Sequence, residues 1–445
     1  MKRSSLYGHI IELLDIIRSS RLPADNLVRE FFRSRRYLGA ADRRYISEQT
    51  YGILRRYRWL EAIVADALAR TGSQIDHEGC SSLLFCAAHA VRSLGREPDE
   101  VRTDLKELGP QATPGLDLES FAGSLKDALP YSPAEESPSQ TIPVEYSFPD
   151  FIVQEWLERF GVDETRSLCA ALNRPAQTTI RVNTLKCSVD ECRTRLAEAE
   201  IGHTEGRWAP AGLVLAKRLN IESVPAFRQG WFEMQDEGSQ LLSHLLSVRQ
   251  GECVVDACAG GGGKTLHLGA LMQNRGTILS IDVDDRRLRR LTRRVRRAGV
   301  SISLVLSAQR QSDAIEQFRG KADAVLVDAP CSGVGTFRRN PGAKLLLTED
   351  DVTAFARTQR RILERYSSLV RPGGRLLYAT CTLLRRENEE IVHEFLSHHP
   401  EFAVASLAPV LEKLGIDAQD DGSVTLLPHR TDTDGFYACL MIKPA

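Results

Sequence analysis

The 445-residue sequence contains ten cysteines, none of them in a C-x-x-C pair. Zinc sites and the disulfide frameworks of small secreted domains use closely paired cysteines, so neither is predicted. No apolar run approaches the roughly 20 residues that a membrane-spanning helix needs. Glu12 and Asp15 interrupt the first apolar segment, which therefore lacks the unbroken core of a signal peptide. We expect a cytoplasmic protein with no metal and no membrane partner.

Acidic and basic residues almost balance, giving a net charge of −1, so no global basic field indicates a nucleic-acid partner. Arginine is nevertheless concentrated in two segments. Residues 29–58 contain nine arginines against three acids, and residues 286–297 contain eight arginines in twelve positions. A charged run is usually the solvated face of a helix, but two such runs in one near-neutral chain favour a polyanionic partner.

Length and patterning divide the chain into several domains, because 445 residues exceed one ordinary domain. Residues 1–129 show apolar positions at helical spacing and predict an all-α domain. Residues 130–147 are rich in proline and serine and predict a linker. Residues 148–238 predict a small α+β subdomain, and residues 239–445 predict a larger α/β domain.

Strand-like and helical segments alternate in the last of these regions. The strand-like segments are ECVVDACAG, GTILSIDVD, ISLVLSA, ADAVLVDAP and GGRLLYATC. Alternation at this spacing predicts a parallel, doubly wound, Rossmann-like sheet. Ligands of such a sheet bind at the carboxyl ends of its strands, so the residues that follow these segments are candidates for a site.

The first of these strands leads into four glycines, Gly260 to Gly263, which open a helix. Glycine lets the backbone turn tightly and approach a ligand where a Cβ would clash. Asp282 ends the next strand, where a carboxylate commonly binds ribose hydroxyls. Together they indicate an adenosyl ligand. The letters GGKT do not make a phosphate-binding P-loop, because the glycine required five places before Gly263 is replaced by Cys258.

Two cysteines follow other strands of the same sheet, in DAPCSGVG and in YATCTLL. Cysteine is often buried as a small apolar residue, and we interpret Cys253 and Cys439 in that way. Cys331 and Cys381 instead lie where a strand passes into a loop, on strands that we expect to be neighbours. Both thiols should therefore share one crevice with Asp328 and the glycine-rich turn.

Two thiols, an acid and an adenosyl ligand match the methylation of cytosine at carbon 5. That carbon is too weak a nucleophile to take a methyl group directly, but addition of a thiolate at carbon 6 makes the ring an enamine that can attack a sulfonium methyl. The reaction also needs an acid near ring nitrogen 3, for which Asp328 is placed, and a group that assists elimination. A free thiol has a pKa of about 8.5, so the pocket must help to ionise it.

These motifs resemble the Sun-type (Fmu-type) RNA cytosine-5 methyltransferases, which depend on S-adenosylmethionine. DACAGGGGKT is similar to that family's D-x-C-A-x-P-G-G-K-T loop, DAPCSG to its D-A-P-C-S motif, and YATCTLLRRENE to its Y-x-T-C-S…E-N-E motif. RVNTLK, FEMQDEGSQL and TDGFYACLMIKP also fit. The helical first domain resembles the NusB-like RNA-binding module in the 16S ribosomal RNA branch of the family.

The resemblance implies an enzyme that methylates cytosine in RNA, with 16S ribosomal RNA as the expected substrate. We expect a monomer. It implies that Cys381 is the nucleophile and that Cys331 assists release of the methylated product. The donor pocket that it implies consists of Cys258, Ala259, Gly260, Gly261, Gly262, Gly263, Lys264, Asp282 and Asp328. We also expect Arg338 and Arg339, beside the active-site loop, to meet RNA phosphates, because such contacts position a substrate without reading its sequence.

Three positions depart from the family pattern. Gly261 replaces a proline, Thr382 replaces a serine, and Ala308 stands where an acid near the adenine is common. Loss of that acid predicts weaker donor binding than is typical of the family. Two alternatives remain open: a transfer RNA cytosine-5 methyltransferase, against which the NusB-like domain argues, and a non-catalytic RNA-binding assembly factor, which would not need both thiols.

Overall fold

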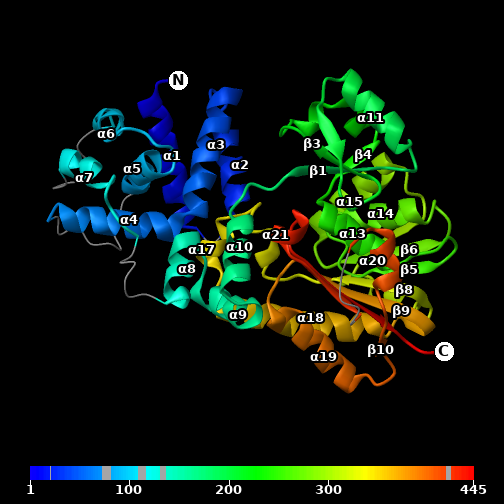
Figure 1. The fold of residues 1–445 in the computed structure, drawn as a ribbon. Coiled ribbons are helices and arrows are strands. Elements are labelled where there is room, and N and C mark those ends of the chain that lie inside the picture. Colours follow the sequence, from blue (N-terminus) through cyan, green and yellow to red (C-terminus); the bar gives the residue numbers. More distant parts are fainter. Residues whose placement is uncertain (21, 73–81, 109–116, 131–136, 417–421) are drawn as a thin grey trace. The chain divides into compact units, whose positions relative to one another are not determined.

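The computed structural model describes residues 1–20, 22–72, 82–108, 117–130, 137–416 and 422–445. The backbone divides into two compact units (Figure 1). Unit 1 comprises Met1–Arg174 and Phe337–Thr348, and unit 2 comprises Pro175–Thr336 and Glu349–Ala445. Within the described ranges, no helix combines the length and the apolar character of a membrane span.

Unit 1 is helical, as predicted for residues 1–129. Its helices are α1 (Arg3–Arg18), α2 (Ala24–Ser34), α3 (Ala40–Arg55), α4 (Tyr57–Arg70), α5 (Ser82–Arg92), α6 (Pro98–Lys106), α7 (Leu118–Ser124), α8 (Pro138–Tyr146), α9 (Asp150–Phe160), α10 (Val162–Leu172) and α17 (Ala343–Leu346). The segment SLLFCAAHAV of α5 has apolar or small residues on every face, and all ten of its residues are buried. A helix of that character lies inside a core, so α5 forms the centre of this one.

The expected linker is in part a helix, because residues 138–146 form α8. Ser137 and Gln140 cap its first turn reciprocally, and Pro138 occupies the first helical position, where no backbone N–H is needed. Residues 131–136 of that linker lie outside the described residues. Helices α9 and α10, which the sequence assigned to the small subdomain, belong to unit 1.

A short segment from the second half of the chain, Phe337–Thr348, also belongs to unit 1. The ring of Phe337 is 1% exposed and lies 5.9 Å from the ring of Phe148. The buried ammonium of Lys344 donates to the carbonyl oxygens of Arg55 and Tyr146 and to Asn173 Oδ1. Because three acceptors satisfy its three donors, this lysine is held without an acidic partner.

Unit 2 begins with a small antiparallel sheet of order β2-β3-β1-β4. Its elements are β1 (Thr178–Val182), α11 (Val189–Glu198), β2 (His203–Glu205), β3 (Gly212–Leu215), α12 (Pro225–Arg228) and β4 (Phe232–Met234). Ile180, Leu213 and Phe232 pack with the two helices in a core of their own. This is the α+β subdomain that the sequence predicted.

The larger sheet of unit 2 is the predicted Rossmann-like sheet, of order β10-β12-β9-β8-β5-β6-β7 with β11 beside β12. Its strands are β5 (Cys253–Asp256), β6 (Thr277–Asp282), β7 (Ser303–Ser307), β8 (Ala322–Asp328), β9 (Val370–Thr380), β10 (Ala403–Val404), β11 (Ser423–Leu426) and β12 (Phe436–Ile442). Five neighbouring strands, β7, β6, β5, β8 and β9, are parallel. Strand β12 runs antiparallel to β9.

Helices cover both faces of this sheet. They are α13 (Glu237–Leu245), α14 (Gly263–Leu271), α15 (Asp285–Ala298), α16 (Ser312–Glu316), α18 (Glu349–Ser367), α19 (Glu389–His398), α20 (Ala408–Lys413) and α21 (Pro428–Thr431). Successive residues of a strand point to opposite faces. Accordingly Val254 packs with α13 and α14, whereas Val255 packs with α18 and α19.

The chain runs from β5 outward to β7 and then returns to β8 and β9 on the other side of β5. Strand order therefore reverses between β5 and β8. In doubly wound sheets, ligands bind at such a reversal, in the crevice outside the carboxyl ends of the strands. Asp256 ends β5 and Asp328 ends β8, so both carboxylates lie at this position.

We predict that Phe337→Ala lowers the free energy of unfolding by about 3–5 kcal/mol, because it removes a buried ring that packs against Phe148. Thermal and denaturant unfolding followed by circular dichroism measure the change. Leu22→Ala, at a side chain that is 55% exposed, is the control and should change stability by less than about 0.5 kcal/mol. Equal effects of the two variants would contradict the assignment of Phe337 to a core.

Candidate active site

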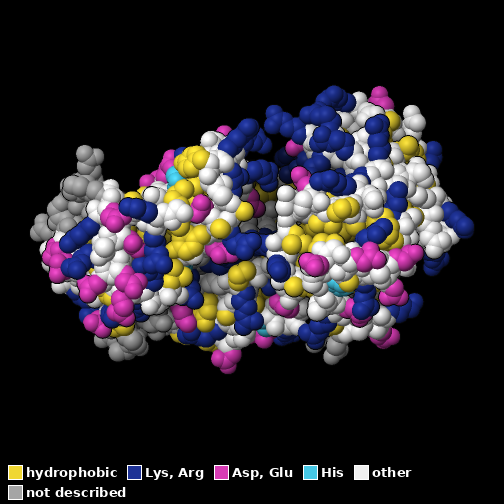
Figure 2. Space-filling model, turned by 90° about the horizontal axis from the view of Figure 1, so that it is seen from above, with side chains coloured by type: hydrophobic (Ala, Val, Ile, Leu, Met, Phe, Trp, Pro, Cys, Tyr) yellow, Lys and Arg dark blue, Asp and Glu magenta, His cyan; other side chains and the backbone are white. Residues whose placement is uncertain are grey.

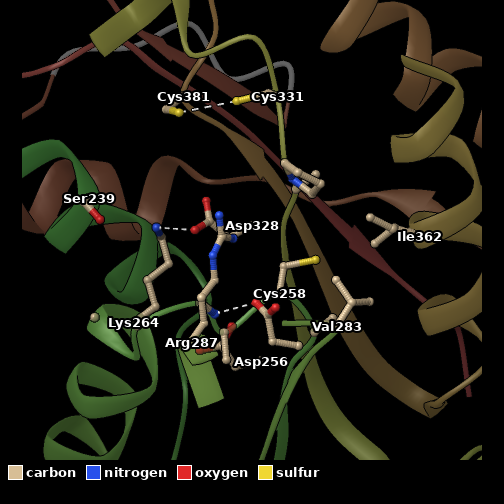
Figure 3. Close-up of a pocket in the computed structure, with 18 of the residues that line it drawn as sticks. Ser239, Asp256, Cys258, Lys264, Val283, Arg287, Asp328, Cys331, Ile362 and Cys381 are labelled. Atoms are coloured by element: carbon tan, nitrogen blue, oxygen red, sulfur yellow. Dashed lines mark hydrogen bonds and ion pairs between the residues drawn. The ribbon is translucent and has the colours of Figure 1, made fainter. Parts of the chain in front are cut away.

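A cavity of about 970 Å³ opens at the reversal of strand order. Most of the predicted site residues line it: Cys258, Ala259, Gly260, Gly261, Gly263, Lys264, Asp282, Asp328, Cys331 and Cys381. Figure 3 shows the two cysteines at one end of the pocket and Asp256, Cys258 and Val283 toward the other. Part of the remaining wall comes from α18, which contributes Phe355, Ile362 and Tyr366. The cavity is therefore lined by carboxylates and apolar side chains together.

The glycine-rich turn needs glycine at two of its positions. Gly260 has φ +54° and Gly262 has φ +89°, a conformation that other residues rarely adopt. A Cβ on Gly262 would lie 2.2 Å from Cδ1 of Leu291, so this residue turns the backbone against α15 rather than lining the cavity. Gly261, where the family has proline, accepts a hydrogen bond on its carbonyl from Arg294. This hydrogen bond restrains the turn at a position where a proline would otherwise limit the backbone.

Two carboxylates at strand ends differ in how they are satisfied. Asp282 accepts the backbone N–H groups of Gly260 and Asp284, each at 2.8 Å. Asp256 accepts the hydroxyl of Thr265 on Oδ2, but its buried Oδ1 has no hydrogen-bond partner within the described residues. Burial raises the pKa of Asp256 from 3.8 to about 6. An unpaired buried acceptor that faces a cavity is a point at which a ligand can bind.

Lys264, from the first turn of α14, forms an ion pair of 2.6 Å with Asp328 at the end of β8 (Figure 3). Burial opposes the charged form of this lysine, but Asp328, Asp256 and Cys381 are close enough to outweigh it, and the pKa of Lys264 is raised. A cation is therefore fixed beside both Asp328 and Cys381. The sequence analysis placed Lys264 in the donor pocket. The structure adds its ion pair with Asp328 and its interaction with Cys381.

The two predicted thiols are brought together. Cys331 follows β8 and Cys381 follows β9, and these strands are parallel neighbours, paired at their ends through Asp328 and Ala379. The sulfur atoms lie 3.3 Å apart, within hydrogen-bond reach for an S–H donor (Figure 3). The expected neighbourhood of the two strands is confirmed.

The charged groups around the two sulfurs differ. The neighbouring sulfur of Cys381 raises the pKa of Cys331 far above its usual range, and burial and Glu387 add to that shift. Lys264 lies on the other side of the pair and interacts with Cys381. The Cys331 sulfur therefore lies toward a carboxylate, and the Cys381 sulfur lies toward an ammonium.

A buried glutamate connects the two thiol loops. Glu387 is 0% exposed, accepts the backbone N–H and hydroxyl of Ser332, and also accepts the side-chain amide of Gln359. Ser332 in turn lies 2.9 Å from the hydroxyl of Thr382, the residue after Cys381. Threonine at this position, in place of the family's serine, keeps the hydroxyl that this contact uses.

Gly335 and Asn388 hold the same loops from two further directions. The N–H of Gly335 donates to the carbonyl of Cys381, and a Cβ at Gly335 would lie 2.2 Å from the carbonyl oxygen of Gly435. Asn388 accepts the hydroxyl of Thr380 and donates to the carbonyl of Thr382. These contacts leave the loops little freedom, so the short distance between the sulfurs is built in.

The sequence assigned no role to Glu387, Gln359 or Asn388. Glu387 and Asn388 do lie within RENEE, part of which entered the family resemblance, and that was the available signal. Gln359 lies in the middle of α18, with no local pattern to distinguish it. Its role follows from packing alone.

The two arginines expected to meet RNA lie in the segment that belongs to unit 1. Arg338 is 3% exposed, and its carbonyl accepts a hydrogen bond from Arg55. A guanidinium so deeply buried does not present itself to a phosphate, so the expectation for Arg338 requires correction. Arg339 is partly exposed, and its contact with RNA stays a prediction.

Other predicted positions are placed as follows. Cys439 is 2% exposed, in agreement with its interpretation as a buried apolar residue, whereas Cys253 is only partly buried. Ala308 is 4% exposed and packs in the apolar core beside the sheet, so no carboxylate occupies that strand end. The weaker donor binding expected from this stays a prediction.

We predict that Asp256→Asn alters the pH dependence of stability. The folded-state pKa of Asp256 is raised from 3.8 to about 6, so its contribution is fully present below about pH 4 and is lost as the pH rises through 6. Between pH 4 and 7 the wild type should lose roughly 2 kcal/mol of unfolding free energy relative to the variant. Urea titrations at a series of pH values measure the difference, and parallel curves for the two proteins would contradict it.

We predict that Glu387→Ala lowers the free energy of unfolding by about 3 kcal/mol or more, because three buried donors lose their acceptor. Glu387→Gln keeps an acceptor oxygen and should recover most of this loss. Denaturant unfolding of both variants is the measurement. If the glutamine variant were as unstable as the alanine variant, hydrogen bonding would not be the reason for the effect.

The chain matches described families and relatives along most of its length. Residues 243–442 match the family described as 16S rRNA methyltransferase RsmB/F, and residues 148–222 match its ferredoxin-like domain. The probable ribosomal RNA small subunit methyltransferase B of Bacillus subtilis is 34% identical over 321 residues, which cover 72% of this chain and 71% of the relative. The Synechocystis protein described in the same words is 30% identical over 417 residues, 91% of this chain and 92% of its own.

Solved structures agree with these matches. The crystal structure of PH0851 covers 100% of this chain and 99% of its own, with a TM-score of 0.76 and 28% identity. A methyltransferase homologue from Pyrococcus horikoshii covers 70% of this chain and 100% of its own, with a TM-score of 0.59 and 28% identity. On the strength of relatives that align over most of its length, the chain belongs to the RsmB/F family of ribosomal RNA methyltransferases.

Proposed function

We propose that this protein transfers a methyl group from S-adenosylmethionine to carbon 5 of a cytosine in small-subunit ribosomal RNA, through a covalent bond between a cysteine sulfur and carbon 6. The observation that supports this most directly is the 3.3 Å separation of the Cys331 and Cys381 sulfurs beside Asp328. One thiol serves addition to the ring, and a second within reach serves the proton that must later leave carbon 5. The choice of RNA rests on the relatives, which are described as ribosomal RNA small subunit methyltransferases.

The described residues fit S-adenosylmethionine as the donor. The turn Gly260–Gly263 presents backbone without side chains, and Asp282 would accept hydrogen bonds from the ribose hydroxyls. The unpaired Oδ1 of Asp256 leaves one acceptor for a donor group of the ligand, and Ile362 and Tyr366 provide an apolar wall for a ring. When bound, S-adenosylmethionine supplies an electrophilic methyl group on its sulfonium sulfur.

Addition to the base begins at Cys381. Its reacting form is a thiolate, the ammonium of Lys264 lies nearby, and the Cys331 thiol can donate a hydrogen bond to it. The sulfur forms a bond to carbon 6, and the ring electrons shift so that carbon 5 becomes the nucleophile. Asp328 would accept a hydrogen bond from the amino group of cytosine, while Lys264 offsets charge that develops on the ring.

Release of the product assigns a different role to Cys331. The sulfur of Cys381 is the largest cause of the raised pKa of Cys331. Once Cys381 is bonded to carbon, its sulfur no longer raises the pKa of Cys331 in this way, and Cys331 can lose its proton to solvent. The Cys331 thiolate then takes the proton from carbon 5, the carbon–sulfur bond breaks, and Cys381 leaves as a thiolate. The methylated base is thereby freed with all protons accounted for.

Cysteine substitutions test this assignment. With S-adenosylmethionine and a transcript of small-subunit ribosomal RNA, Cys381→Ala should abolish methyl transfer, because no sulfur adds to the ring. Cys331→Ala should accumulate a covalent protein–RNA adduct that appears as a shifted band on a denaturing gel. Cys253→Ala, at the amino end of β5, should behave as wild type and serves as the control.

Other outcomes of this experiment are equally clear. Adduct formation by Cys381→Ala with normal turnover by Cys331→Ala would reverse the two roles. Preferred methylation of a transfer RNA transcript would replace the proposed substrate. The site of the new 5-methylcytosine is mapped by bisulfite sequencing of ribosomal RNA.

A further inference from the structure

Helix α15 carries eight arginines that the site leaves largely unexplained. With about 100° of rotation per residue, these arginines spread over one half of the helix, and Leu288, Leu291 and Ala298 occupy the buried half. Residues 286–298 contain no acidic side chain. Solvated helices usually alternate charges of opposite sign at this spacing, whereas like charges three and four residues apart repel.

Structural roles account for part of this set. Arg294 and Arg297 both pair with Glu233, a carboxylate of β4 that is 1% exposed. Arg294 also bonds to the glycine-rich turn. Arg287 lines the cavity together with Arg294, and Figure 3 shows its side chain extending into the pocket. These three arginines connect the helix to the site and to the small sheet.

The other five are exposed, and within the described ranges no acidic side chain forms an ion pair with any of them. We call Arg286, Arg289, Arg290, Arg293 and Arg296 the arginine face. Arg289, Arg293 and Arg296 lie within about 60° of one another around the helix, so three guanidinium groups form a row along it. Lys186 adds a further positive charge at the end of α15. Its side chain lies against Gly299, where a Cβ would be 3.0 Å from the lysine Cε.

We propose that the arginine face, on the helix whose Arg287 and Arg294 line the cavity, binds the phosphate backbone of the substrate RNA. This inference rests on the proposed function for the identity of its partner. A planar guanidinium matches the geometry of a phosphate, and a row of them suits a chain of regularly spaced anions. Figure 2 shows Lys and Arg side chains gathered along one side of unit 2, whereas Asp and Glu side chains are mixed among them toward its opposite side.

The proposal is tested with the triple variant Arg289→Gln, Arg293→Gln, Arg296→Gln. Glutamine forms helices well, and Arg287 and Arg294 at the cavity stay intact. Binding of fluorescently labelled polyuridylate is measured at several salt concentrations, because this RNA offers phosphates but no cytosine. The slope of log affinity against log salt should become shallower by about two, at roughly 0.7 per lost contact with a single strand. Affinity near 0.1 M salt should fall roughly tenfold to a hundredfold.

A matched control removes the same charge elsewhere. Arg249, Arg275 and Arg319 are exposed and precede β5, β6 and β8, at the edge of the sheet opposite the cavity. Their triple replacement by glutamine should leave the salt slope unchanged. S-adenosylmethionine affinity, measured by calorimetry, should be the same in both triple variants and in the wild type.

Each outcome bears on one proposal or the other. A wild-type salt slope in the α15 variant, or an equal loss in the control variant, would overturn the arginine face even if Cys331→Ala still trapped an RNA adduct. A slope reduced in the α15 variant alone would support the arginine face even if no adduct formed, in which case the proposed chemistry would fail by itself.

Discussion

The parallel pairing of β8 with β9 is the contact on which the site depends. It brings the ends of two strands to the same level, with Asp328 opposite Ala379, so the loops that follow must emerge side by side. A separation of 3.3 Å between the sulfurs is then a consequence of register rather than of a flexible approach. Glu387, buried between the loops, and Gly335, which no larger residue could replace without a clash, remove the freedom that remains. Such support is what holds a reactive pair within a few tenths of an ångström.

Charge compensation sets the chemistry of that pair. A buried carboxylate is costly unless it is paired or hydrogen-bonded, and the site contains several. Asp328 is neutralised by Lys264, and Asp282 is satisfied by backbone N–H groups. Asp256 is incompletely satisfied, and its raised pKa reflects this. Because Lys264 lies toward one thiol and Glu387 toward the other, the two cysteines have different electrostatic surroundings. This difference gives a physical basis for two distinct roles in one proposed reaction.

Helix α15 shows how one motif can serve structure and recognition together. Glu233 orients two of its arginines, one of which also holds the glycine-rich turn. The remaining arginines turn outward along the same helix. In unit 1 the arginine-dense segment is likewise divided, since Arg55 and Arg58 donate to backbone carbonyls of that unit while Arg29 and Arg33 are exposed. Charge counts along a sequence cannot separate these uses, because the separation depends on which residues face a buried carboxylate or carbonyl.

The sequence by itself determined the elements and the chemistry at their ends. The alternation of strand-like and helical segments predicted the Rossmann-like sheet, and the ends of its strands indicated the two thiols, Asp282 and Asp328. It misjudged residues 138–146 because prolines were taken to indicate a linker, although a proline in the first turn of a helix is well tolerated. Tertiary structure alone decided that Arg338 is buried in unit 1, that Gln359 reaches Glu387, and that Lys264 lies beside Cys381. Local spacing specifies which side a residue takes within its own element, whereas contacts between distant elements follow from packing, and packing is a property of the whole fold.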